Sequence, residues 1–182
     1  IEINPAHSAS YNNRAAAYVK QGDYDRAIAD ATKALEIDPK LTAAYLSRGQ
    51  AHERKREYER AIADAAKAIE LAPRLALAYN NRGAAYARKG AYDRALADTT
   101  KAIEIDPKLA PAYANRAYAF VSKGDNKRAI ADASKAIELD ANGAFAYSVR
   151  ADAYERKGDN DRAVADYRSA LSRDANMQYS KD

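Results

Sequence analysis

The chain has 182 residues and a formal net charge of +4, from 30 basic and 26 acidic side chains. It contains no cysteine, which excludes a disulfide framework and a thiolate metal site. Basic and acidic residues alternate along the sequence, which is typical of solvated helix surfaces and not of a nucleic-acid stripe. No apolar run approaches the length of a membrane span, and the first residues lack signal-peptide features. We therefore expect a soluble protein, with the cytoplasm as its simplest location.

The same residue types recur every 34 residues. Tyrosine marks this interval at five positions: Tyr11, Tyr45, Tyr79, Tyr113 and Tyr147. A fixed period of this size indicates stacked structural repeats. We expect five repeats, at 8–41, 42–75, 76–109, 110–143 and 144–177. Residues 1–7 read as the tail of a preceding repeat and residues 178–182 as the start of a further helix, so we expect a piece of a longer protein.

Each repeat contains two amphipathic helical segments, most clearly in the third repeat. The first runs from about Leu77 to Lys89, where a basic last turn followed by Gly90 signals a helix end. The second begins near Tyr92 and stops before Pro107, because the residue before proline disfavours the helical region. Two helices joined by a short turn form an antiparallel hairpin. Such hairpins bury their apolar faces by stacking on their neighbours, which predicts an all-α solenoid.

Three departures from the repeat predict local differences. His52 takes an inward-facing aromatic position of the second repeat, where we expect it to pack in the core. Arg56 replaces the turn glycine of that repeat, which predicts a strained or rearranged turn. Tyr167 stands where the other repeats have alanine or threonine, and we expect it to refill core volume.

No group of residues suggests catalysis. The two histidines, His7 and His52, occupy unrelated positions, so no catalytic triad or metal cluster follows from them. No strand precedes a glycine-rich phosphate loop. We expect a protein that is not an enzyme and that uses no cofactor and no metal.

Every repeat has an arginine on its first segment and an aspartate on its second. In the third repeat these are Arg82 and Asp98, which flank the helix faces that we expect to meet. A buried arginine needs a partner, so an ion pair between the two helices is one prediction. The alternative partner of Asp98 is Arg94 on the same helix. Either pairing is structural.

The repeat resembles the tetratricopeptide repeat (TPR) family. Tyr79, Gly83, Tyr86, Ala95 and Pro107 occupy places that the family pattern fills with aromatic, small and turn residues. The resemblance spans the chain five times. It implies a right-handed superhelix whose first helices line a concave groove that binds extended peptides, with no catalytic role.

The groove positions that the resemblance implies contain two polar stripes. One is rich in asparagine, whose amide both donates and accepts hydrogen bonds with a peptide backbone. The other is basic and favours an acidic ligand or a C-terminal carboxylate. The predicted peptide-binding residues are Asn12, Asn13, Lys20, Ser47, Gln50, Arg54, Asn80, Asn81, Arg88, Asn115, Tyr118 and Arg156. In the fifth repeat the groove positions are Phe145, Ser148, Val149, Asp152, Glu155 and Arg156.

We therefore predict a protein–protein interaction scaffold that binds an extended peptide or a partner helix, with a partner of acidic character. Two alternatives remain open. The chain could self-associate by stacking of its terminal repeats, because neither end shows an obvious polar capping helix. It could also be the recognition arm of a larger enzyme.

Overall fold

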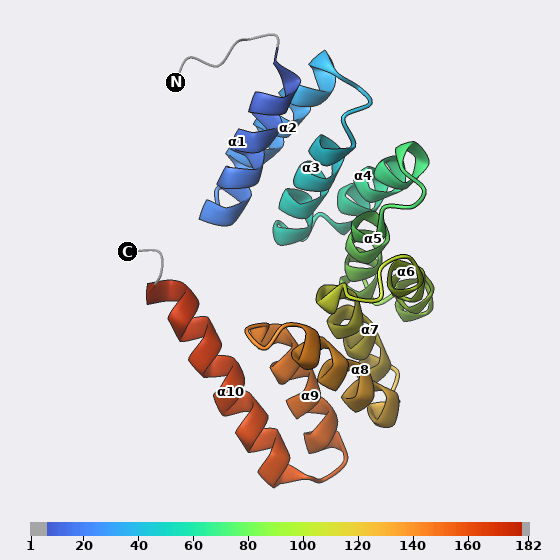
Figure 1. Cartoon of the computed structure of the whole chain (residues 1–182), viewed down its shortest axis with the longest axis vertical. Coiled ribbons are helices and arrows are strands. Elements are labelled where there is room, and N and C mark those ends of the chain that lie inside the picture. The colour runs from blue at the N-terminus through green and yellow to red at the C-terminus, as the bar shows by residue number, and fades with distance from the viewer. Residues whose placement is uncertain (1–6, 180–182) are drawn as a thin grey trace. The chain divides into compact units, whose positions relative to one another are not determined.

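The computed structural model describes residues 7–179, with side chains described up to residue 174. All regular structure in this range is helical (Figure 1). The helices are α1 (Ser8–Gln21), α2 (Tyr24–Ile37), α3 (Thr42–Arg54), α4 (Tyr58–Leu71), α5 (Ala76–Arg88), α6 (Tyr92–Ile105), α7 (Ala110–Ser122), α8 (Asn126–Leu139), α9 (Ala144–Arg156) and α10 (Asn160–Tyr179). We call α1, α3, α5, α7 and α9 the first helices, and the others the second helices.

The chain divides after Lys89 into two compact units, with α1–α5 in the first and α6–α10 in the second. In the first unit α3 packs against α1, α2, α4 and α5. In the second unit α7 packs against α6, α8 and α9, and α9 packs against α8 and α10. Consecutive first helices are therefore neighbours within each unit. The division falls inside the third predicted repeat, between its two helices.

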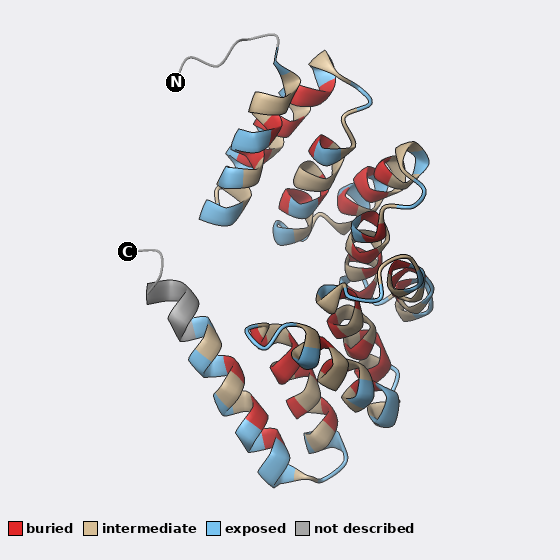
Figure 2. Cartoon of the chain, viewed as in Figure 1, coloured by how far each residue is buried: buried red, intermediate tan, exposed pale blue. Residues whose placement is uncertain are grey.

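Alanine supplies most of the core. Buried residues follow the helix faces that meet within each unit (Figure 2). On α2 these are Ala27, Ala31 and Ala34, all fully buried. The same register on α8 buries Ala129, Ala133 and Ala136. Methyl side chains let helix axes approach closely, so a larger side chain at these positions causes overpacking.

Bidentate ion pairs join the two helices of a repeat. Arg48 donates from Nε and Nη2 to the two carboxylate oxygens of Asp64, at 3.0 and 2.7 Å. The same geometry occurs at Arg14–Asp30, Arg116–Asp132 and Arg150–Asp166. Two parallel hydrogen bonds fix both distance and orientation, which sets the register of each hairpin. Arg82 and Asp98 belong to different units, so their pairing stays a prediction.

The same arginines also tie neighbouring repeats together. Arg48 Nη1 donates to Thr32 Oγ1 of the preceding repeat at 3.2 Å. Arg116 and Arg150 make the equivalent bond to Thr100 and Ser134. Each of these arginines also lies over the tyrosine three residues before it, with 5.6–5.7 Å from Cζ to the ring centroid. A single side chain thus joins three helices.

Arg56 adopts the left-handed backbone conformation predicted to strain its turn. Its φ is 63°, and it is the one non-glycine residue with positive φ in the described part of the chain. The turn keeps the hydrogen bonds of the glycine turns, with Glu57 N donating to His52 O as Asp23 N donates to Tyr18 O. An L-residue pays roughly 1–2 kcal/mol for this conformation. The expected strain is therefore confirmed, and the turn is not rearranged.

His52 is buried as predicted, but it does more than pack. Its side chain is 7 % exposed, and Nδ1 lies 2.7 Å from Glu57 Oε2. The first, fourth and fifth repeats place an aromatic ring here and cover it with an arginine from the second helix, as Arg128 covers Phe120 at 4.4 Å. The second repeat replaces this cation–π contact with a histidine–carboxylate hydrogen bond.

The C-terminal helix differs from the other second helices. We expected a further helix to begin at residue 178, but α10 runs without a break to Tyr179. Residues 180–182 lie outside the described residues, as do residues 1–6 of the expected preceding repeat. Tyr167 is half-buried, and its hydroxyl reaches two carboxylates of α9, so it does more than refill core volume.

Candidate peptide-binding surface

All predicted peptide-binding residues lie on first helices, where the sequence placed them. α1, α3 and α5 carry nine of them in the first unit: Asn12, Asn13, Lys20, Ser47, Gln50, Arg54, Asn80, Asn81 and Arg88. α7 and α9 carry Asn115, Tyr118 and Arg156 in the second unit. Consecutive first helices pack side by side within a unit, so the predicted residues of each unit lie on neighbouring helices.

Two of the predicted asparagines are buried, and one of them links two helices. Asn12 is 8 % exposed and its Oδ1 accepts a 2.9 Å hydrogen bond from Ser47 Oγ. This bond links α1 to α3. Asn80 is 4 % exposed, and its Nδ2 donates to Oδ1 of Asn81 at 3.3 Å. Asn13 lies beside Asn12 in sequence but is exposed, so it is better placed to meet a ligand.

The basic stripe is partly neutralised in the first unit. Lys20, Arg54 and Arg88 are exposed. Glu53 on α3 lies between the two arginines, with its carboxylate oxygens 3.7 Å from Nε of each. Two of the three cations of this stripe therefore lie beside one carboxylate.

Arg156, the basic residue of the second unit, is engaged in packing. Its Nη1 donates to the backbone oxygen of Val121 at 3.3 Å. That oxygen belongs to the last turn of α7, where carbonyl groups lack helical partners. The guanidinium therefore links α9 to α7, although the residue is exposed.

The second unit presents an aromatic pair that the predicted stripes include only in part. Tyr118 on α7 and Phe145 on α9 are half-buried, with ring centroids 6.0 Å apart and planes inclined by 48°. Both pack on a core cluster that contains Phe120, Val121 and Val149. Phe145 occupies a predicted groove position, but neither the asparagine nor the basic pattern singles it out.

Two acidic residues, Asp152 and Glu155, follow Phe145 on α9. Asp152 Oδ1 and Glu155 Oε2 lie 2.6 and 2.9 Å from the hydroxyl of Tyr167 on α10. The hydrogen bond to Asp152 and the burial of the ring raise the pKa of Tyr167. Sequence reasoning missed this cluster, because the only signal was one tyrosine at a position that the other repeats give to alanine or threonine.

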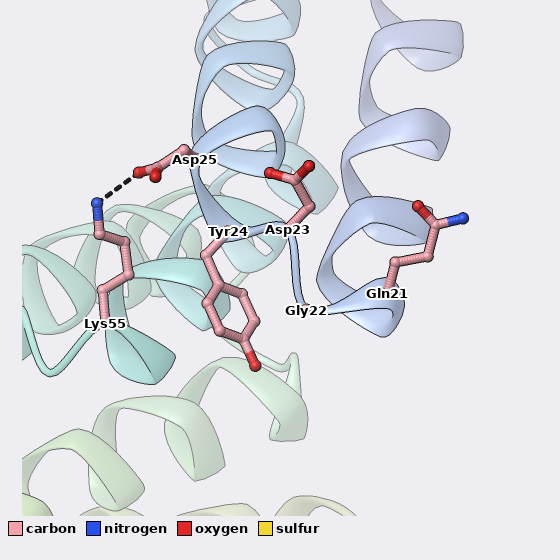
Figure 3. A pocket seen from close by; sticks show the side chains of 6 residues that line it. All are labelled: Gln21, Gly22, Asp23, Tyr24, Asp25 and Lys55. Atoms are coloured by element: carbon pink, nitrogen blue, oxygen red, sulfur yellow. Dashed lines mark hydrogen bonds and ion pairs between the residues drawn. The ribbon is translucent and has the colours of Figure 1, made fainter. Parts of the chain in front are cut away.

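A hollow of about 490 Å³ lies at the turn between α1 and α2, and none of the predicted residues lines it. It is lined by Gln21, Gly22, Asp23, Tyr24, Asp25 and Lys55 (Figure 3). Lys55 Nζ pairs with Asp25 Oδ1 at 2.5 Å across it. Lys89–Glu59 and Lys123–Asp93 are the equivalent pairs of later repeats, so this contact is part of the repeat structure.

We also looked for a metal site and for a membrane-spanning helix in the part of the chain that the structure describes. No group of three or more histidine, cysteine, aspartate or glutamate side chains there could hold a metal ion. None of the described helices combines the length and the apolar character needed to cross a membrane.

Comparison with known proteins decides the family. Tetratricopeptide repeat models match residues 8–41 and 76–109, and residues 42–75, 110–142 and 146–177. The chain belongs to the tetratricopeptide repeat family. No curated protein sequence matches it. The expected all-α solenoid of antiparallel helix pairs is therefore confirmed, and the TPR repeats of the chain provide the fold of a protein-interaction scaffold.

Solved structures show the same fold. A crystal structure of MamA is 27 % identical, covers 89 % of this chain and 95 % of its own, and has a TM-score of 0.67. TTC0263, a thermophilic TPR protein of Thermus thermophilus, is 21 % identical with a TM-score of 0.83, covering 95 % of this chain and 96 % of its own. YrrB, described as a TPR protein with an unusual peptide-binding site, is 20 % identical with a TM-score of 0.63, covering 98 % and 93 %.

Proposed function

We propose that the chain is a non-catalytic scaffold that binds an extended segment of a partner protein on its first helices. The observation that carries this proposal is the side-by-side packing of α1, α3 and α5, which puts the equivalent exposed residues Lys20, Arg54 and Arg88 on neighbouring helices. Asn13, Gln50 and Arg54 are exposed members of this surface. A surface that is already formed lowers the ordering cost of binding on the scaffold side.

We further propose that the first unit prefers an acidic segment. Lys20, Arg54 and Arg88 outnumber Glu53 on this surface, so a carboxylate of the partner meets a net positive field. Arginine can hold a carboxylate through two parallel hydrogen bonds. Arg54 Nε lies 3.7 Å from Glu53 Oε2, beyond normal hydrogen-bond length, so a ligand carboxylate can compete for Arg54.

Selection from a random library of displayed twelve-residue peptides tests the proposal. Selected peptides are synthesised and titrated into the ¹⁵N-labelled chain, and the amide shifts are mapped. We expect shifts concentrated on first helices, with acidic residues enriched among the selected sequences. Shifts confined to second helices, or a library that yields no binder, contradict the proposed function.

End-to-end stacking of copies is the second candidate, and one observation favours it. Val164 and Leu171 on α10 are 47 % and 69 % exposed, whereas Leu35, which matches Leu171 in α2, is covered by α3. Against it, Tyr167 and Arg168 replace the small Ala31 and Thr32 of α2 on the face that receives the next first helix. Light scattering over a concentration series tests this: a strict monomer contradicts stacking, and a mass that grows with concentration supports it.

A further inference from the structure

One stripe of α9 places an apolar end and an acidic end on the same side of the helix. Phe145, Val149 and Asp152 are spaced i, i+4 and i+7, so their side chains share one face. Phe145 packs against Tyr118, and buried Val149 belongs to the core cluster on which both rings pack. Asp152 lies two turns beyond Phe145, and Glu155 adds a second carboxylate. We call Phe145, Val149, Asp152 and Glu155, together with Tyr118 of α7, the α9 stripe.

The two carboxylates of the acidic end share one hydroxyl donor, that of Tyr167. The Tyr167 hydroxyl has one proton, so it donates fully to only one of the two carboxylates at a time. Neither Asp152 nor Glu155 forms an ion pair with another described side chain. Both carboxylates are reachable from solvent, since Asp152 is partly exposed and Glu155 is exposed. A cationic group brought to this point gains charge-assisted hydrogen bonds.

The repeat fold does not require this combination. At the position of Asp152 the other repeats have Ala16, Gln50, Ala84 and Tyr118, and at the position of Phe145 they have Ala9, Ala43, Leu77 and Pro111. At the position of Tyr167 they have Ala31, Ala65, Thr99 and Ala133. Four repeats therefore fold without the aromatic–acidic arrangement, which separates it from the residues that build every repeat.

We propose that the α9 stripe binds a partner segment that carries an apolar side chain and, about three residues away, a lysine or arginine. This rests on the proposed function and assigns a ligand chemistry to the second unit. The seven steps from Phe145 to Asp152 rise about 10 Å along the helix at ~1.5 Å each. A peptide in the polyproline II conformation advances ~3.1 Å per residue with three residues per turn, so side chains three positions apart lie on the same side at a similar separation. The apolar residue packs on the rings of Tyr118 and Phe145 while the cation meets the carboxylates.

Three synthetic probes test the proposal. Each is an acetylated, amidated nine-residue peptide of glycine and serine. The first carries phenylalanine and, three positions later, arginine; the second has glutamate in place of the arginine; the third has alanine in place of the phenylalanine. We expect the first peptide to shift the amides of the α9 stripe and to bind about tenfold more tightly than either of the others, as one charge-assisted contact allows.

Protein variants separate the acidic end from the fold. Asp152→Asn with Glu155→Gln is expected to bring the affinity for the arginine peptide down to that for the glutamate peptide. Glu138→Gln, at an exposed carboxylate of α8 that pairs with Lys135, is the matched control and leaves the preference intact. Tyr167→Phe keeps the ring and removes the competing hydroxyl, so it maintains or increases affinity for the arginine peptide.

The outcomes distinguish this proposal from the proposed function. Equal affinity for the arginine and glutamate peptides, or an arginine preference that survives the Asp152→Asn/Glu155→Gln change, overturns the α9 stripe while first-helix binding by library peptides stands. If no library peptide maps to a first helix, the proposed function itself fails. Shifts on the α9 stripe with the expected preference support both.

Discussion

The hydroxyl of Ser47 donates a 2.9 Å hydrogen bond to the amide oxygen of Asn12, across the boundary between α1 and α3. Asn12 is therefore buried and joins two helices, whereas its neighbour Asn13 is exposed to solvent. We predict that Asn12→Ala lowers the free energy of unfolding by about 1–2 kcal/mol, because Ser47 then loses its partner at a part-buried site. Asn13→Ala is expected to change stability by less than about 0.5 kcal/mol, as is usual for surface positions. Urea unfolding monitored by circular dichroism measures both, and equal losses contradict the assignment.

Replacing Arg56, which has a positive φ, by glycine should stabilise the protein. Arg56→Gly removes the strain of the left-handed conformation and is expected to raise the free energy of unfolding by about 1 kcal/mol. The match to the turns at Gly22, Gly90, Gly124 and Gly158, whose φ values are 79–85°, supports this expectation. Gly158→Arg is the reverse substitution and should destabilise. A neutral or destabilising Arg56→Gly, measured by thermal unfolding, would show that the Arg56 side chain contributes more than its backbone costs.

The ladder of ion pairs between repeats is interrupted at the last junction. Lys55, Lys89 and Lys123 each pair with an acidic residue 30 positions earlier, but the same step from Lys157 leads to Lys127. We predict that Lys127→Asp raises stability by about 0.5–1 kcal/mol, through a new surface pair and a favourable charge near the start of α8. Lys127→Ala isolates the relief of like charge and should give a smaller gain. The gain of Lys127→Asp should shrink in 1 M salt; a gain that salt leaves unchanged has another cause.

The lowered pKa of Glu57 predicts that the stability of the second repeat depends on pH. The hydrogen bond from His52, followed by that from Arg60, lowers the pKa of Glu57 below its ordinary value of 4.5. A carboxylate with a depressed folded-state pKa contributes stability that is present above pH 4.5 and is lost as the pH falls through the lower folded value. Glu57→Gln should therefore flatten the acid limb of the stability profile relative to the wild type. Parallel profiles between pH 3 and pH 6 would exclude Glu57 as a contributor.

Most of the fold follows from the sequence because the signals repeat. The third repeat is an example: the expected helices, from about Leu77 to Lys89 and from near Tyr92 to about Ile105, match α5 and α6 within a residue at each end. Glycine turns, prolines after the second helix and alanine spacing recur in most repeats. A repeat that lacks one of these signals can therefore still be assigned from the others.

The surface is harder to predict. The family resemblance implied groove positions for both Asn12 and Asn13, but adjacent helix residues point about 100° apart, and only Asn13 is exposed. The Tyr167 cluster was missed for a different reason. It depends on a contact between α9 and α10 that occurs in one repeat only, so the repeat pattern carries no trace of it. The repeat pattern also did not indicate the burial of Asn12, because its hydroxyl partner, Ser47, lies 35 residues away, one position beyond the 34-residue repeat register.

Calorimetric titration of a library-selected peptide tests the central claim most directly. Asn81→Ala combined with Arg88→Glu changes the α5 part of the first-unit surface, while Arg74→Glu reverses an exposed charge in the same unit outside the first helices. We predict that the double variant binds the peptide at least about tenfold more weakly with unchanged helicity, as expected for the loss of a charge-assisted contact, whereas Arg74→Glu stays within about twofold. Unchanged affinity in the double variant, or an equal loss in Arg74→Glu, would contradict binding on the first helices.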